Sequence, residues 1–346
     1  MKKSPMLLVA MCLALASCAR ERESIRHYEL RFSEGFAPVM QDGKWGFIDR
    51  SGKLVIAPQY DRVLPFAEGL AQVRMRGAWM YIDSTGRVIL RRSGCRFSHG
   101  LAAAPDPVSR GWGFIDQTGA FRIPATYELV HDFHEGLAAV LGTNGLWGYV
   151  DTNGVPVVPA RHETTWDFHE GLASCGLAGD VKYINRQGDV VLALPGEMTR
   201  GLRFQEGLAL IAVGRKNGYI NRAGEVVIPP DEKYSYWHWF SEGLAGIHVG
   251  SLWGFCDTNG AVAIEPAFDE LHSFSDGLAA VRKGAHWGFI DRTGGFVIPP
   301  SFDYAFPFSQ ERAGVVLGST LGYIDRTGQW IWKPTKFYTD WIDPFD

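Results

Sequence analysis

The fold is decided by a stretch that reads Phe274-Ser275-Asp276-Gly277-Leu278-Ala279, then Trp287-Gly288-Phe289-Ile290-Asp291-Arg292-Thr293-Gly294, then Phe296-Val297-Ile298-Pro299-Pro300. Alternating bulky residues predict short strands over 277–281, 287–290 and 296–298. Residues 291–294 resemble a type I turn whose last glycine adopts positive φ and whose aspartate accepts backbone N–H bonds. The two prolines are expected to end the third strand, since proline cannot donate to a ladder. Gly288, inside a strand, indicates a bulge or the close approach of a neighbouring backbone or ring.

This stretch is one copy of an internal repeat. Its first element recurs nine times, with the phenylalanine at Phe32, Phe66, Phe97, Phe133, Phe168, Phe204, Phe240, Phe274 and Phe308. Its second element carries a tryptophan in six copies: Trp45, Trp79, Trp112, Trp147, Trp253 and Trp287. A tryptophan that recurs so often is expected to anchor the core, because a single binding site would not require it in every copy.

These residues closely resemble the WG-repeat family of bacterial proteins, whose signature is a Trp-Gly pair followed by an aromatic residue, isoleucine and aspartate. The resemblance covers nearly all of the chain after its first 31 residues. It implies a protein built from repeats, and it brings no catalytic residues that could be transferred to this sequence.

We predict an all-β fold, because no long amphipathic helical pattern follows the N-terminal segment. Nine repeats of about 34 residues, over 32–337, are expected to stack as three-stranded units in an open, twisted β-solenoid. The alternative is a closed, propeller-like ring, although propeller blades usually have four strands and more residues. Arg312 replaces an apolar residue in the last repeat, which is typical of a terminal cap. Residues 338–346 are a C-terminal tail.

The N-terminus has the pattern of a lipoprotein signal peptide over residues 1–17. Lys2 and Lys3 precede an apolar run that is too short to span a bilayer. The run ends at Leu15-Ala16-Ser17-Cys18, which resembles the bacterial lipobox, and this resemblance implies that Cys18 is lipidated. Residues 18–31 are a charged tether. Since Ala19 is not the aspartate typical of inner-membrane retention, we expect anchoring in the cell envelope, on the outer membrane, with the periplasmic or the surface face left open.

Composition and motifs argue against several classes of function. The net charge of −4 argues against a nucleic-acid partner. The sequence has no motif for a nucleotide, a catalytic triad or a zinc site, so we predict no enzyme activity, no catalytic residues, no cofactor and no metal. Acidic residues recur at two repeat positions, which indicates turn chemistry rather than a catalytic pair. The cysteines Cys95, Cys175 and Cys256 lie in non-adjacent repeats, so we expect free thiols there.

One region departs from the repeat pattern. Repeats five and six lack the tryptophan, and aromatic residues flank them. His134 and His169 share a variable position of adjacent repeats, which we interpret as partly exposed turn histidines. The candidate binding patch comprises Trp166, His169, Tyr234, Tyr236, Trp237, His238 and Trp239. The alternative is that these repeats have drifted and the aromatic side chains fill space.

The sequence favours a monomeric, envelope-anchored, non-catalytic scaffold that binds an unidentified protein or polymer, since extended repeat surfaces commonly do so. The alternatives are a glycan- or peptidoglycan-binding lipoprotein that uses exposed aromatic faces, and a hydrolase with scattered carboxylates.

Overall fold

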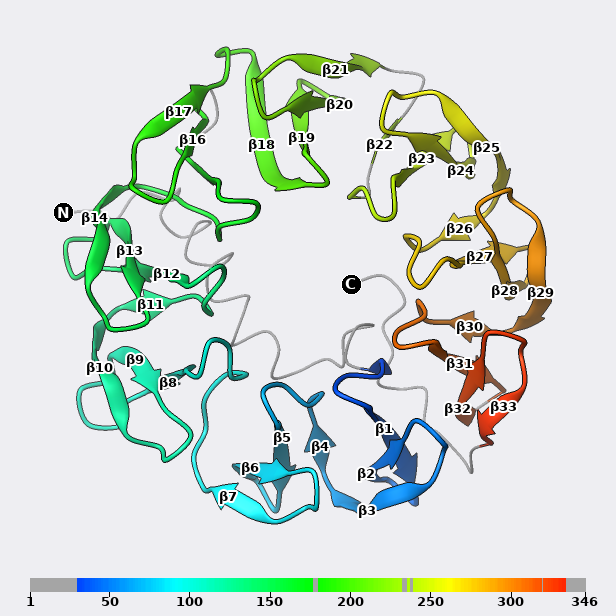
Figure 1. Ribbon diagram of the computed structural model, residues 1–346, viewed down its shortest axis with the longest axis horizontal. Helices are drawn as coiled ribbons and strands as arrows, with labels where there is room; N and C mark the ends of the chain where they lie inside the picture. The colour runs from blue at the N-terminus through cyan, green and yellow to red at the C-terminus, as the bar shows by residue number, and fades with distance from the viewer. Residues whose placement is uncertain (1–29, 177–179, 232–234, 237–238, 319, 334–346) are drawn as a thin grey trace.

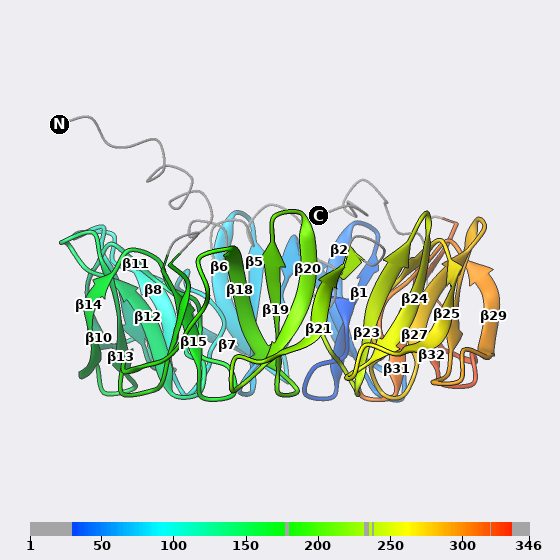
Figure 2. The same ribbon diagram turned by 90° about the horizontal axis from the view of Figure 1, so that it is seen from above.

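The computed structural model describes residues 30–176, 180–231, 235–236, 239–318 and 320–333. The strands in this part of the chain form nine small antiparallel sheets, which stand as blades around one axis (Figure 1). Seen from the side, the ring is a flat disc whose strands run between its two faces (Figure 2). The protein is therefore a nine-bladed β-propeller. The prediction of an open β-solenoid is wrong, and the alternative of a closed ring is correct.

The strands follow the chain from blade to blade. Blades one to three hold β1 (Phe36–Gln41), β2 (Lys44–Asp49) and β3 (Leu54–Tyr60); β4 (Arg62–Val63), β5 (Leu70–Met75), β6 (Ala78–Asp83) and β7 (Val88–Leu90); and β8 (Ala102–Pro105), β9 (Trp112–Ile115) and β10 (Phe121–Tyr127). Blades four to six hold β11 (Leu129–Val130), β12 (Leu137–Leu141), β13 (Trp147–Asp151) and β14 (Pro156–His162); β15 (Ala173–Cys175), β16 (Lys182–Ile184) and β17 (Val190–Ala193); and β18 (Met198–Gln205), β19 (Leu208–Val213), β20 (Lys216–Asn221) and β21 (Val226–Asp231). Blades seven to nine hold β22 (Ser235–Tyr236), β23 (Leu244–Val249), β24 (Leu252–Asp257) and β25 (Val262–Phe268); β26 (Glu270–Leu271), β27 (Ala279–Lys283), β28 (His286–Ile290) and β29 (Phe296–Phe302); and β30 (Tyr304–Ala305), β31 (Arg312–Leu317), β32 (Thr320–Asp325) and β33 (Trp330–Trp332).

Six of the nine described sheets have four strands, where the sequence pattern predicts three. The extra strand is the innermost one and is short in most blades; in β26, Glu270 and Leu271 pair with Arg282 and Val281. The outermost strand also continues through its prolines, since β29 runs to Phe302. Proline is tolerated there because an edge strand has one side without partners, and it also hinders pairing with further strands.

The glycine after the repeat tryptophan is explained by the close approach of the outer strand. A Cβ at Gly288 would lie 2.6 Å from the Ile298 carbonyl oxygen, nearer than real Cβ atoms come to other atoms. The ladder between β28 and β29 shifts register on both sides of Phe289, which marks a bulge. The sequence prediction of a bulge with close backbone approach is confirmed.

The aspartate turn also forms as predicted. The Asp291 carboxylate accepts hydrogen bonds from the Thr293 and Gly295 N–H groups, at 2.8 and 3.2 Å. Gly294 has a φ of 85° and donates from its N–H to the Asp291 carbonyl oxygen. These contacts use the acid to build the turn.

A second repeated acid joins neighbouring blades. It lies in a two-residue turn with positive φ at both positions, as at Glu242 and Gly243. The preceding blade's Glu206 accepts hydrogen bonds from both of these N–H groups, at 2.7 and 2.8 Å. Equivalent contacts, each from one blade to the next, are made by Glu34, Glu68, His99, Glu135, Glu170, Glu242, Asp276 and Gln310.

The junction of blades nine and one repeats most of the contacts of the other junctions. Gln310 Oε1 accepts from the Gly35 N–H at 2.9 Å, and Ser309 Oγ donates to the Phe32 carbonyl oxygen at 2.8 Å. The Tyr323 hydroxyl donates to the Pro38 carbonyl oxygen at 2.7 Å, and its ring packs against Phe32. Side-chain packing and hydrogen bonds thus close the ring between two sheets, each built from consecutive strands.

Arg312 takes part in this junction, so its interpretation as a terminal cap is wrong. Its Nε donates to the Arg50 carbonyl oxygen at 3.3 Å, and the Arg50 guanidinium donates to the Gln310 carbonyl oxygen at 3.0 Å. An arginine from the following blade bonds the same carbonyl position elsewhere in the ring, as Arg186 does at Glu135. In the sequence alone Arg312 resembles a terminal cap, because the residue that it bonds, Arg50, lies 262 positions away.

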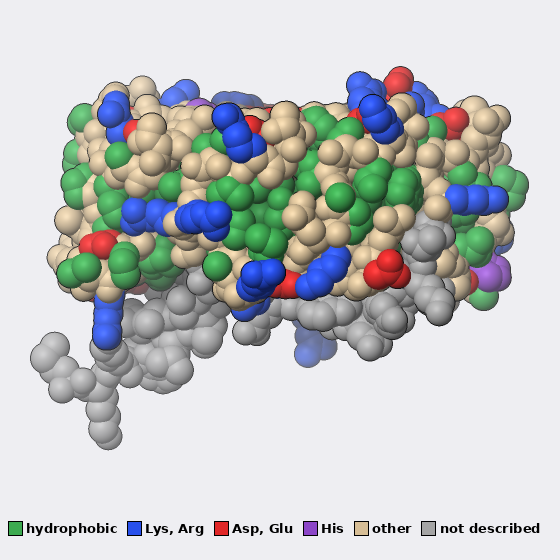
Figure 3. Space-filling model, turned by 90° about the horizontal axis from the view of Figure 1, so that it is seen from below, with side chains coloured by type: hydrophobic (Ala, Val, Ile, Leu, Met, Phe, Trp, Pro, Cys, Tyr) green, Lys and Arg blue, Asp and Glu red, His purple; other side chains and the backbone are tan. Residues whose placement is uncertain are grey.

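The repeat tryptophans divide into two groups. Trp45, Trp147 and Trp287 are buried, which confirms that they belong to the core, whereas Trp79, Trp112 and Trp253 are half-buried. On the outer wall, hydrophobic side chains lie in a band that lysine and arginine border (Figure 3). Residues of the outer strands, such as Leu54, Ile89 and Phe296, are exposed.

Two further points concern thiols and helices. Cys175 and Cys256 are free and buried, as predicted, but Cys95 is disulfide-bonded, so the prediction is wrong for that thiol. Within the ranges described above, no helix has the length and apolar character needed to cross a membrane.

Candidate functional site

The inner rim of the ring is where the blades differ most. The innermost strands, such as β4, β11, β26 and β30, lie nearest the axis (Figure 1). Each leads to the buried repeat phenylalanine, and the residue just before the phenylalanine varies from blade to blade. That position holds Pro65, Ser273 and Pro307 in three blades and arginine in blades one and three, as Arg31 and Arg96. In blades four to seven it holds Asp132, Asp167, Arg203 and Trp239.

Asp167 is the centre of a polar cluster that spans blades four to six. Its Oδ1 lies 2.9 Å from His131 Nδ1, and its Oδ2 lies 3.6 Å from His134 Nε2. The rings of His134 and His169 pack with centroids 5.2 Å apart. Two histidines of the preceding blade therefore contact one carboxylate, and a third histidine packs on one of them.

Mutual attraction sets the protonation of this cluster. Burial alone would lower the pKa of His131, but the hydrogen bond and charge of Asp167 outweigh it, and the pKa is raised. Burial alone would raise the pKa of Asp167, but the three histidines outweigh it, and the pKa is lowered. Both shifts favour the pair of imidazolium and carboxylate.

Arg203 extends the cluster into blade six. Its guanidinium carbon lies 4.5 Å from the centroid of the Trp239 ring, and its Nη1 lies 3.4 Å from His169 Nε2. Burial lowers the pKa of Arg203, and the charge of Asp167 acts against that shift. Burial and the charges of Arg203 and His134 likewise lower the pKa of His169.

Aromatic residues also contact the residues of this cluster and the segment that leads to it. The His131 ring packs on Trp147 with centroids 5.0 Å apart. The Tyr149 hydroxyl donates to the Trp166 carbonyl oxygen at 2.5 Å, which fixes the strand segment that leads to Asp167. The Trp166 side chain itself is 51% exposed. An exposed indole therefore directly precedes Asp167 in the chain.

The candidate patch is only partly described. His169 packs on His134 and Trp239 packs on Arg203, so both contact the Asp167 cluster, and Trp166 precedes Asp167 in the chain. Tyr236 belongs to β22, where its backbone pairs with Ile247. The remaining candidates, Cys18, Tyr234, Trp237 and His238, lie outside the described residues.

The sequence interpretation missed the two residues that organise the site, Asp167 and Arg203. The signal was present in the position before each repeat phenylalanine, which turns charged in consecutive repeats. The turn histidines were noted, but their convergence on one carboxylate depends on how neighbouring blades pack.

The carboxylates of the repeated acids are engaged in hydrogen bonds with backbone N–H groups. Hydrogen bonds, led by that of the Thr85 hydroxyl, hold the pKa of Asp83 at about 2. A general acid needs a raised pKa, so such turn acids are poor candidates for catalysis. Among the described residues, no group of three or more histidine, cysteine or acidic side chains is arranged to hold a metal ion.

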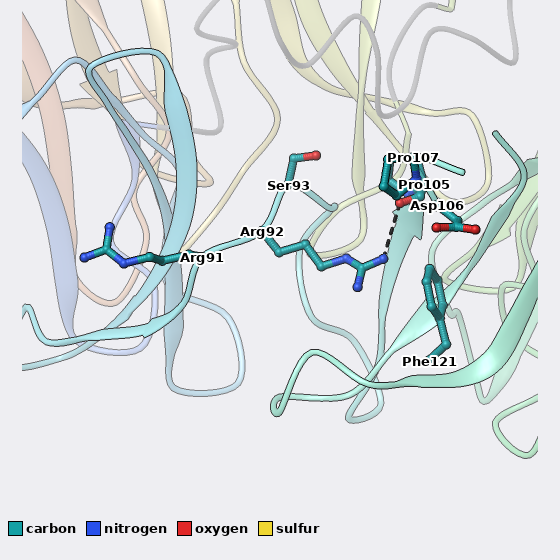
Figure 4. A pocket seen from close by; sticks show the side chains of 7 residues that line it. All are labelled: Arg91, Arg92, Ser93, Pro105, Asp106, Pro107 and Phe121. Atoms are coloured by element: carbon teal, nitrogen blue, oxygen red, sulfur yellow. Dashed lines mark hydrogen bonds between the residues drawn. The ribbon is translucent and has the colours of Figure 1, made fainter. Parts of the chain in front are cut away.

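A hollow with a volume of about 630 Å³ lies between blades two and three (Figure 4). Arg92 crosses its lining, donates to the Gly119 and Pro105 carbonyl oxygens, and lies over the Phe121 ring. Asp106 lies on the same lining. The hollow is thus lined by Arg91, by the bonded Arg92 and by Asp106.

The His131–Asp167 pair predicts a specific pH dependence of stability. The raised pKa of His131 stabilises the fold fully below about 6.5, and this contribution is lost as the pH rises through the folded-state value. The lowered pKa of Asp167 stabilises the fold above about 3.8, and this contribution is lost as the pH falls through its folded-state value. Replacing His131 with glutamine should therefore cost about 1–3 kcal/mol near pH 5. Thermal unfolding should show a smaller cost near pH 9, and an equal loss at both pH values would contradict the ion pair.

Comparisons with known proteins agree with the repeat and the ring. The model of the WG containing repeat family matches residues 30–45, 45–78, 112–146, 147–174, 218–252, 253–285 and 287–320. No curated protein matches the chain. Among solved structures, one described as the eukaryotic initiation factor has a TM-score of 0.59 at 14% identity, and the match covers 85% of this chain and 94% of that one. The computationally designed Ika8 protein has a TM-score of 0.47 at 13% identity, with 77% and 93% covered. The first likeness supports the fold alone, and the family matches cover most of the chain, which therefore belongs to the WG containing repeat family.

Proposed function

We propose that this protein is a non-catalytic scaffold that binds a protein or polymer partner at the Asp167 cluster. A lipid on Cys18 holds it, as a monomer, at the bacterial cell envelope, on the outer membrane. The observation that carries the binding role is the group of charged side chains that three neighbouring blades bring together around Asp167. A sector that keeps charged side chains half-buried beside an exposed indole suits recognition.

A non-catalytic role is supported by how the acids are used. The turn acids bond backbone N–H groups within a blade or in the next one. The Asp167 carboxylate is occupied by His131 and His134. These carboxylates are engaged in holding structure, which leaves little basis for a catalytic pair.

A second candidate function is glycan or peptidoglycan binding. The exposed Trp166 favours it, since an indole face can stack on a sugar ring while nearby charged groups bind hydroxyls. Both candidates use the same site, and binding assays separate them.

The binding role is tested with the lipid-free protein, starting at Ala19, as bait. Wild-type bait should retain a protein from envelope extracts, or should sediment with purified peptidoglycan, according to which candidate holds. Trp166→Ala should reduce that binding at least tenfold. Phe296→Ala is the matched control, because it removes an exposed aromatic residue from the outer wall of blade eight. Binding that both variants keep in full, or that neither material supports, would refute the proposal.

The envelope anchor is tested at Cys18. Changing Cys18 to serine removes the thiol that the lipobox pattern marks for acylation. We expect this variant to lose radiolabelled fatty-acid incorporation and to leave the membrane fraction. A variant that is still acylated and still sediments with membranes would show that the anchor is assigned wrongly.

A further inference from the structure

His169 occupies a position where most blades carry a serine that ties them to the next blade. The serine hydroxyl follows the repeat phenylalanine and donates to the carbonyl oxygen of the next repeat phenylalanine, at 2.7 or 2.8 Å. This bond is made by Ser33, Ser98, Ser241, Ser275 and Ser309. The other four blades have Ala67, His134, His169 and Gln205 at this position. In blade five the side-chain contact to the next blade is instead made by the His169 ring, with Arg203.

The contact between His169 and Arg203 requires a neutral imidazole. Arg203 Nη1 lies 3.4 Å from His169 Nε2. A guanidinium has only donors, so Nε2 must be the acceptor and cannot carry a proton. Protonation would place two donors and two positive charges against each other across the junction of blades five and six. A single proton therefore turns this contact from attraction into repulsion.

The other charged groups around His169 do little to offset this repulsion. From blade four, the His134 ring packs on it with centroids 5.2 Å apart and is a further site for a proton. Two acids attract the charged form through space, Asp167 of blade five and Glu135 of blade four. Asp167 already bonds His131, and Glu135 already accepts a hydrogen bond from a backbone N–H group in blade five.

The two sides of blade five therefore respond to acid in opposite ways. Burial and the charges of Arg203 and His134 lower the pKa of His169, so its contribution to stability is present above about 6.5 and is lost as the pH falls through the folded-state value. His131 has the opposite shift, because its raised pKa favours the ion pair with Asp167 that joins blade four to blade five.

We propose that acid loosens the junction of blades five and six by protonating His169, and that it spares the junction of blades four and five. The loosening is local, since the Tyr183 hydroxyl still donates to the Leu202 carbonyl oxygen across the same junction. Acid would then also weaken partner binding at the Asp167 cluster. Only this last consequence rests on the proposed function.

Hydrogen exchange of the lipid-free protein, measured by mass spectrometry at about pH 7.5 and about pH 5, tests this junction directly. The probes are three equivalent N–H groups, each of which donates to a glutamate of the preceding blade. They belong to Gly171 at the junction of blades four and five, Gly207 at that of blades five and six, and Gly243 at that of blades six and seven. After correction for the intrinsic effect of pH, the Gly207 segment should exchange about fivefold faster at the lower pH. The other two segments should change by less than about twofold, and they control for protonation of the glutamates.

Variants assign the response to one histidine. His169→Gln should abolish it, because glutamine gains no proton, and Gln205 already stands at the equivalent position of blade six. Arg203→Gln should reduce it by removing the opposing charge. His286→Gln is the matched control, since it removes an exposed histidine of blade eight that lies 3.7 Å from Asp303, and it should keep the response of the wild type. If a variant does not fold, the comparison of the three junctions in the wild type decides the question.

Three results would overturn the inference. They are exchange at Gly207 that acid does not accelerate, equal acceleration in all three glycine segments, and a response that a folded His169→Gln variant keeps in full. The measurement needs no partner. Its failure would therefore leave the binding role to be decided by Trp166→Ala, and failure of that binding test would leave the acid-sensitive junction in place.

Discussion

Replacing Tyr323 with alanine is expected to lower the free energy of unfolding by roughly 3–5 kcal/mol, as for other buried aromatic residues. Tyr323 is fully buried at the junction of blades nine and one, where its ring packs on Phe32 and its hydroxyl donates to Pro38. In an open stack this face of the last repeat would have no neighbour. The size of the loss therefore reports whether the two ends of the repeat array meet.

The matched control is Tyr183 in blade five. It is equally buried, its ring packs on Phe204, and its hydroxyl donates to the Leu202 carbonyl oxygen at 2.7 Å, the same distance as at Tyr323. Urea unfolding should give losses for Tyr323→Ala and Tyr183→Ala that agree within about 1 kcal/mol. A loss at Tyr323 far below the loss at Tyr183 would mean that the first and last blades do not pack together.

The second large effect is expected at Trp147. Its side chain is only 7% exposed and packs in the core between blades four and five. Removing the indole should cost roughly 3–5 kcal/mol through lost burial and the cavity left behind. It should also release the His131 ring that rests on it, and so loosen the Asp167 cluster.

Trp166 provides the comparison for Trp147. Because its side chain is about half exposed, Trp166→Ala should change the unfolding free energy by less than about 1 kcal/mol. Iodide should quench the Trp166 fluorescence more strongly than that of Trp147, as single-tryptophan deletions would reveal. Similar small losses for both variants would assign Trp147 to the surface and contradict a structural role for the repeat tryptophan.

Local features of the fold follow from the sequence because they depend on neighbouring residues. The Asp291 turn and the bulge opposite Gly288 are set within one repeat, so one copy suffices to predict them. The short innermost strand was missed because two residues, such as Glu270 and Leu271, carry no periodic signal. The prediction that the prolines end the outer strand is wrong because the sequence does not show that this strand has an edge without partners.

Ring closure and the site depend on distant or adjacent repeats, which local patterns do not encode. Closure is fixed by the angle between blades, and Tyr323 meets Phe32 only when nine such angles complete a circle. The site arises because Asp167 of one blade faces His131 of the preceding blade. Aligning the repeats by position would have exposed the charged run at Asp132, Asp167 and Arg203, but not which side chains pair.

Small-angle X-ray scattering on the lipid-free protein tests the closed ring most directly. A compact chain of this length has a radius of gyration of about 20 Å, and a flat nine-bladed ring should stay close to that value. An open stack of nine sheets about 10 Å apart would be about 90 Å long, with a radius of gyration of roughly 28 Å. A value near 20 Å with a disc-shaped envelope is the expected result, and a rod with the larger value would contradict the propeller.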